Sequence, residues 1–124
     1  LAARHSVTYL TLDDGTAAED AVERASEYAS RVITVPFRPP PKRGAAFYWA
    51  LAKNLASSLP YAIERYRSAE LQAQIRDHAC GADILVCDFL APSLNVPDGL
   101  PVSTVLFQHN VEAALWDRHA AVPQ

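Results

Sequence analysis

The sequence predicts an α/β domain with a parallel, doubly wound β-sheet and flanking helices. Three observations support this fold class. Short runs rich in β-branched residues alternate along the chain with longer segments of helical periodicity. The run at residues 83–88 is apolar over nearly its whole length, which is typical of a strand covered on both faces. The 124 residues suffice for a single core, so we expect one domain over residues 1–124.

The first part of the chain contains a predicted strand–helix–strand unit. Residues 6–12 alternate partly and are rich in β-branched and aromatic side chains, which predicts a strand. A capping box of Thr16 and Glu19 predicts the start of an amphipathic helix that runs to about Ala29. Residues 31–36 form the next predicted strand, and the helical crossover between the two strands makes them parallel.

A proline-rich loop and a series of helices follow. Three consecutive prolines at residues 39–41 cannot continue a strand and favour an extended loop. Residues 45–58 have helical character, which Pro60 interrupts. Ser68 is the expected N-cap of a further helix that ends near Ala79.

The last part of the chain supplies two more predicted strands, at residues 83–88 and 102–108. A turn at residues 97–99, Pro-Asp-Gly, lies in the loop between them. Asn110 is placed to cap a final helix over residues 111–121.

Composition and residue usage exclude several classes of protein. Half of the residues are apolar and a fifth are charged, which indicates a globular chain. The net charge of −3 argues against a nucleic-acid partner, because proteins that bind the phosphate backbone are normally basic. The histidines lack ligand spacing for a metal, and no dinucleotide or Walker motif is present. Cys80 and Cys87 are expected to be reduced, small core residues of an intracellular protein, and the absence of Met indicates an internal fragment of a longer protein.

The residues after the last predicted strand carry the most polar chemistry of the chain. Ligands of open parallel sheets bind outside the carboxyl ends of the strands. There, the His109 imidazole can donate to, accept from or titrate against a ligand. Asn110 can cap the helix, and Glu112 lies in its first turn. The alternative is that Asn110 is only a cap and His109 only a hydrogen-bonded loop histidine.

Charge is unevenly distributed along the chain. Residues 13–30 carry six acidic side chains and one arginine, whereas residues 37–67 carry six basic side chains and one glutamate. Aromatic residues interleave with the basic ones, a pattern that suits an acidic, amphiphilic partner such as a lipid-linked phosphate or an anionic membrane surface. Arg38, Lys42 and Arg43 are the candidate contacts to this partner. The alternative is an ordinary helix pair whose aromatic side chains pack on the sheet.

A family resemblance rests on residues 107–118, which read Phe-Gln-His-Asn-Val-Glu-Ala-Ala-Leu-Trp-Asp-Arg. This segment resembles the N-terminal domain of GT-B, family 4-like glycosyltransferases, notably bacterial exopolysaccharide-type sugar transferases. Those proteins carry H-N-V-E followed by a Trp and an Arg after an inner strand. Residues 1–12, 82–88, 59–60 and 65–68 are also similar to passages of the family, so the resemblance covers nearly the whole chain.

The resemblance implies a Rossmann-like sheet and a sugar transfer that retains the anomeric configuration. His109 matches the cleft histidine that contacts the acceptor or the donor sugar, and Asn110 and Glu112 match its motif neighbours as substrate-binding residues. The substrates are then a nucleotide-sugar and a glycan or lipid-linked acceptor, with no cofactor and no required metal. The expected location is cytoplasmic, with peripheral contact to the inner face of the membrane.

Two parts of the family's pattern are absent from the sequence. The family's first strand, expected between the strands at residues 6–12 and 83–88, is missing, as is the second domain that holds most of the donor nucleotide. The chain would therefore be the acceptor-side part of the enzyme, inactive alone, with two strand edges left open or paired directly with each other. The alternative function is a non-catalytic α/β ligand-binding or interaction module.

Overall fold

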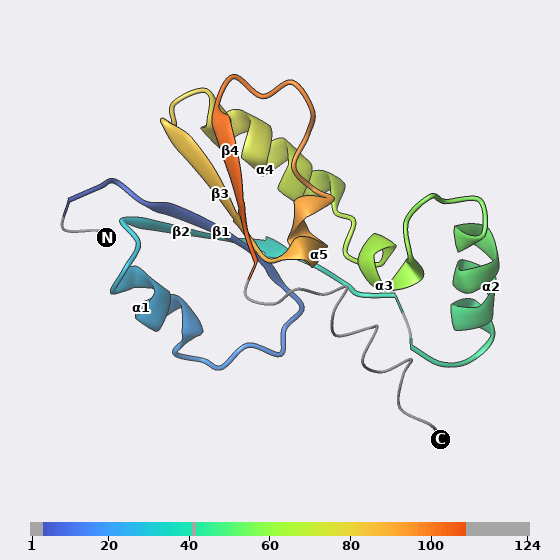
Figure 1. The fold of residues 1–124 in the computed structure, drawn as a ribbon. Coiled ribbons are helices and arrows are strands. Elements are labelled where there is room, and N and C mark those ends of the chain that lie inside the picture. Colours follow the sequence, from blue (N-terminus) through green and yellow to red (C-terminus); the bar gives the residue numbers. More distant parts are fainter. Residues whose placement is uncertain (1–3, 41, 109–124) are drawn as a thin grey trace, which may run out of the picture.

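The computed structural model describes residues 4–40 and 42–108, in which helices and strands alternate (Figure 1). In chain order the elements are β1 (Thr8–Asp13), α1 (Ala21–Ser26), β2 (Arg31–Pro36), α2 (Ala45–Asn54), α3 (Tyr61–Glu64), α4 (Ala69–Ala79), β3 (Ile84–Asp88), α5 (Leu90–Ser93) and β4 (Ser103–Phe107). The predicted α/β class is confirmed, and all four predicted strands are present within two residues of their expected bounds.

The strands form two separate parallel pairs. β1 pairs with β2, with Thr8 opposite Arg31, and β3 pairs with β4, with Ile84 opposite Ser103. The crossover from β1 to β2 contains α1, and the crossover from β3 to β4 contains α5. In the part of the chain that the structure describes, β1 and β3 do not pair directly, so the four strands do not form one continuous sheet.

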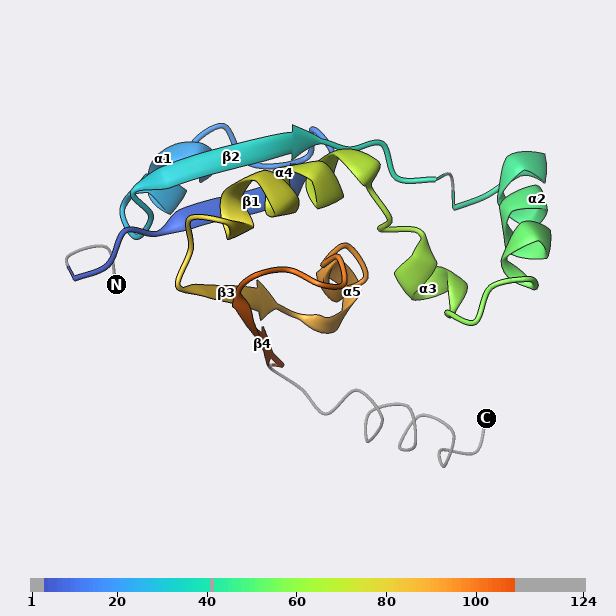
Figure 2. The same cartoon turned by 90° about the horizontal axis from the view of Figure 1, so that it is seen from above.

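β1 and β3 each have one open edge within residues 4–40 and 42–108. Figure 2 shows the order β2, β1, β3, β4, with α4 lying against β1. The Arg31 amide donates to the Val7 carbonyl, and parallel ladders repeat every second residue, so the amide of Leu10 points away from β2. The Phe89 amide donates to the Phe107 carbonyl, so the amide of Val86 likewise points away from β4. Both open edges face the space between the pairs, where an unpaired edge is a liability.

Hydrogen exchange measured by NMR on the whole chain tests these open edges. The amides of Leu10 and Val86 are expected to exchange about tenfold faster than those of Thr11 and Cys87, which face a partner strand. Equal protection of all four amides would show that another strand occupies the open edges.

The predicted start of the first helix is wrong. Thr16 and Glu19 form no capping box, and α1 begins only at Ala21. The Asp14 carboxylate accepts hydrogen bonds from both the backbone amide and the hydroxyl of Thr16, at 3.0 Å for the amide. These hydrogen bonds hold Thr16 in a turn that precedes α1, whose N-cap is Asp20.

α4 confirms the prediction for its segment and packs on β1. The Ser68 hydroxyl accepts a hydrogen bond from the Leu71 amide at 3.2 Å, which makes Ser68 the N-cap. Leu71 and Ala79 are buried, and they lie on one face of the helix.

The described core is small. Its buried hydrophobic residues are Ala25, Ala29, Val35, Leu71, Ala79 and Cys87. Burial raises the pKa of the Cys87 thiol, so this cysteine stays neutral. Cys80 is exposed, so the prediction of two core cysteines is wrong for Cys80, and both cysteines are free as expected. No helix among the described residues is long and apolar enough to cross a membrane.

Candidate functional site

The carboxyl ends of three strands converge around α3 and the residue Tyr66 that follows it. Tyr66 lines one pocket together with Asp14, just after β1, and Phe37, just after β2. It also lines a second pocket together with Phe89, just after β3. This is the edge of a parallel arrangement at which ligands bind, so the two pockets form the candidate site.

The first pocket, here called the basic pocket, has a volume of about 220 Å³. It is lined by Leu12, Asp14, Phe37, Pro39, Lys42, Arg65 and Tyr66. Two of these side chains are cationic and one is a carboxylate. The pocket therefore carries a net positive charge and suits a small anionic group.

Arg65 is held in place on one side and has a free donor on the other. Its Nη2 donates to the Pro40 carbonyl at 3.3 Å, and its guanidinium carbon lies 5.6 Å from the centre of the Tyr66 ring. Its Nε is buried and has no hydrogen-bond partner among the described residues. A buried N–H without an acceptor is costly, so the Arg65 guanidinium is held here at some cost in stability.

Asp14 is the fixed anion of the basic pocket. Hydrogen bonds from the Thr16 side chain and backbone lower the pKa of the Asp14 carboxyl, and the positive charge of Lys42 lowers it further. Asp14 therefore stays ionised and offsets part of the charge of Lys42, which leaves Arg65 as the cation with an unused donor.

The second pocket, here called the apolar pocket, has a volume of about 570 Å³. It is lined by Pro60, Ala62, Ile63, Tyr66, Phe89, Leu90 and Ala91, from α3, α5 and the segments around them. Tyr66 is shared with the basic pocket, and its ring stacks on Phe37 at 6.3 Å between centroids. A site for an anionic group and an apolar site thus lie side by side.

Phe89 adopts a strained backbone in the wall of the apolar pocket. Its φ of 82° and ψ of 156° lie in a region that essentially only glycine occupies. Its amide donates to the Phe107 carbonyl at 2.9 Å, which ties it to β4. Backbone strain of this kind gathers at functional sites, and a phenylalanine there keeps a large apolar ring where glycine would relieve the strain.

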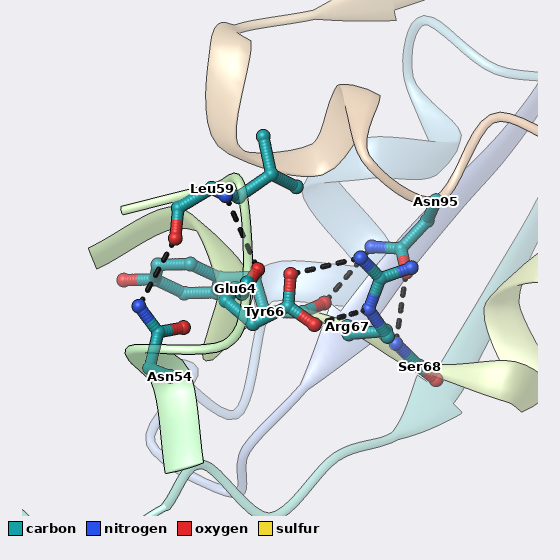
Figure 3. Close-up of polar contacts among 8 residues, drawn as sticks. Asn54, Leu59, Glu64, Tyr66, Arg67, Ser68 and Asn95 are labelled. Carbon is teal, nitrogen blue, oxygen red and sulfur yellow. Dashed lines mark hydrogen bonds and ion pairs between the residues drawn. The ribbon is translucent and has the colours of Figure 1, made fainter. Parts of the chain in front are cut away.

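Asn95 fixes the position of Tyr66, as Figure 3 shows. This asparagine is fully buried; its Nδ2 donates to the Tyr66 carbonyl at 2.9 Å, and its Oδ1 accepts from the Ser68 amide at 2.8 Å. One side chain therefore joins the loop after α5 to the junction between α3 and α4. Sequence reasoning missed Asn95, for which the only signal was a polar residue between Leu94 and Val96.

The residues predicted for the site have different outcomes. His109, Asn110 and Glu112 lie outside the described residues, and β4 ends at Phe107, two positions before His109. Of the predicted basic surface, only Lys42 lines a pocket. Arg38 and Arg43 are exposed on the loop between β2 and α2 and line neither pocket. Arg65 and Tyr66, central to the observed site, belong to the basic, aromatic stretch at residues 37–67 but were not among the candidate contacts.

No protein-family model, curated protein or solved structure matches the chain. Its function is therefore argued from its own residues. Within residues 4–40 and 42–108, no group of three or more histidine, cysteine, aspartate or glutamate side chains is placed to hold a metal ion.

Proposed function

We propose that the chain is the acceptor-side part of a retaining glycosyltransferase. The protein would move a sugar from a nucleotide-sugar donor to a glycan or lipid-linked acceptor, on the cytoplasmic side of the membrane and at its inner face. In this proposal the two strand pairs belong to one Rossmann-like sheet, with a further strand between β1 and β3. The support comes from the residues around His109 and from the two pockets.

The observation that carries the proposal is the adjacency of the basic and apolar pockets. A phosphate joined to an apolar chain needs a cationic site beside an apolar one, and Tyr66 is a wall of both pockets. Arg65 lines the basic pocket, and its guanidinium charge suits a phosphate oxygen bound there. This combination favours the lipid-linked acceptor over a plain glycan.

His109 is the proposed catalytic residue. It follows β4 in the chain, at the carboxyl end of a strand parallel to β3. In the proposed reaction its ring hydrogen-bonds the acceptor or the donor sugar as positive charge develops on the sugar. Asn110 and Glu112 are proposed to bind substrate from the start of the following helix.

Arg65 gives a direct test of acceptor binding, with Arg67 as a matched control. Sugar transfer to a polyprenyl phosphate is measured with the complete polypeptide of the reading frame. Arg65→Gln is expected to raise the KM for the acceptor by about tenfold or more, because a charged hydrogen bond to phosphate is lost. Arg67 is ion-paired with Glu64 at 2.6 Å and lines neither pocket, so Arg67→Gln is expected to leave that KM unchanged.

Two outcomes would contradict the proposal. If both variants raise the KM equally, the basic pocket is not the phosphate site. If the wild-type protein binds polyprenyl phosphate but transfers no sugar from any nucleotide-sugar, the chain is the non-catalytic ligand-binding module instead.

A further inference from the structure

We propose that α2 and the residue before its N-cap form a docking surface for an anionic lipid bilayer. This surface, the α2 surface, consists of Arg43, Tyr48, Trp49, Lys53 and Leu55. The inference deepens the proposed function, since it rests on the membrane location given there. Vesicle binding tests it without any sugar transfer, so the two can fail separately.

The apolar side chains of α2 face outward. Tyr48 is 68% exposed, Trp49 is 65% exposed and Leu55, the C-cap, is 87% exposed. None of the residues of α2 is buried in the described structure. Because Tyr48 and Leu55 are seven residues apart, they lie on the same side of the helix. A surface helix normally turns its apolar stripe toward the core, so α2 has the opposite arrangement.

These exposures also decide one of the sequence alternatives. The alternative that the aromatic residues pack on the sheet is wrong for Tyr48 and Trp49. Figures 1 and 2 show α2 at the outer end of the molecule, beyond α3 and away from both strand pairs. Phe47 is the aromatic residue of α2 that packs inward, with its ring 5.7 Å from that of Tyr61 in α3.

The charge around α2 selects an anionic partner. Residues 28–63 contain five basic side chains and no acidic one. Arg43 lies immediately before the N-cap, and the Lys53 ammonium lies 5.4 Å from the centre of the Trp49 ring. A lysine beside an exposed tryptophan can place its charge among phosphate head groups while its stem covers the ring.

A bilayer fits this surface better than a protein partner does. Tryptophan and tyrosine prefer the boundary between head groups and acyl chains, where one end of the ring is apolar and the other wet. Basic residues beside them add attraction to anionic lipids. Through Phe47 and Tyr61, α2 packs against α3, which lines the apolar pocket. Docking by α2 would therefore bring that pocket close to the lipids.

Co-sedimentation with vesicles tests the α2 surface on the 124-residue chain. The vesicles contain phosphatidylcholine alone or an equimolar mixture with phosphatidylglycerol. The wild-type chain is expected to bind the mixed vesicles and to release them at about 1 M salt, where charges are screened within roughly 3 Å. Arg43→Gln with Lys53→Gln is expected to weaken binding by on the order of 30-fold. Trp49→Ser with Leu55→Ser is expected to weaken it by about tenfold or more.

Three control variants make the result specific. Val22→Ser removes an exposed apolar side chain of α1, and Arg76→Gln removes an exposed charge of α4; both are expected to bind as the wild type does. Arg67→Gln is also expected to keep vesicle binding, because Arg67 is ion-paired with Glu64 and lies outside the α2 surface. Equal binding to both kinds of vesicle, equal losses in the controls, or self-association of the chain through Trp49 and Leu55 would overturn the inference.

Discussion

His109→Ala is expected to lower kcat by on the order of 10²–10³ while leaving the fold intact. Loss of one positioned polar group at a site of developing charge typically has an effect of this size. The sugar carries positive charge in the transition state of a retaining transfer, so a group already in place contributes most there. Turnover is measured with the complete polypeptide, a nucleotide-sugar and polyprenyl phosphate, and circular dichroism checks the fold.

Two further variants separate catalysis from structure at this position. His5 is exposed on the segment before β1, so His5→Ala is expected to keep full turnover. Asn110→Ala is expected to act mainly through stability, by about 1 kcal/mol from a lost helix cap, with a smaller effect on substrate binding. If His109→Ala retains near-full turnover and unaltered acceptor affinity, His109 is a loop histidine and the resemblance gives no catalytic residue.

Asn95→Leu is expected to lower the free energy of unfolding by about 2–5 kcal/mol. The change leaves the Ser68 amide and the Tyr66 carbonyl without their partner in a buried place, and each such group costs about 1–3 kcal/mol. Small domains are stable by only about 5–15 kcal/mol, so this is a large share. Urea denaturation of the whole chain measures the loss as a lower midpoint at unchanged slope.

Asn54 is the matched control for Asn95 (Figure 3). Its Nδ2 donates to the Leu59 carbonyl at 3.0 Å, but its buried Oδ1 has no hydrogen-bond partner among the described residues. Asn54→Leu therefore removes an unsatisfied group together with one bond, and its expected cost is about 1 kcal/mol or less. Equal losses in the two variants would show that Asn95 does not hold the junction between α3 and α4.

Local patterns predicted most of the secondary structure. The β-branched runs at residues 31–36 and 83–88 became β2 and β3, because such side chains fit a pleated, half-buried surface. Ser68 became the N-cap of α4, because a serine hydroxyl just before a helix can accept a hydrogen bond from a backbone amide of the first turn.

Competition between neighbouring groups explains what the sequence did not reveal. The Asp14 carboxylate accepts hydrogen bonds from the amide and the hydroxyl of Thr16, and this turn takes the place of the predicted first helical turn. Asn95 accepts a hydrogen bond from Ser68, which is 27 residues away in the sequence, and local sequence patterns do not predict a contact over such a separation. Lys42, which was singled out from the basic stretch, lines the basic pocket, whereas Arg65 and Tyr66 follow α3 in a segment that carries no strand-end signal.

The division into two strand pairs has a consequence for how the chain folds. Strand partners are 23 residues apart in the first pair and 19 in the second, as Thr8–Arg31 and Ile84–Ser103 show. Each pair closes a loop of only about 20 residues, so its two strands come together at a modest entropic cost. During synthesis the first pair is complete once Pro36 has left the ribosome, before any of the second exists. The docking of α4 on β1 bridges about 60 residues and is the step that joins the halves.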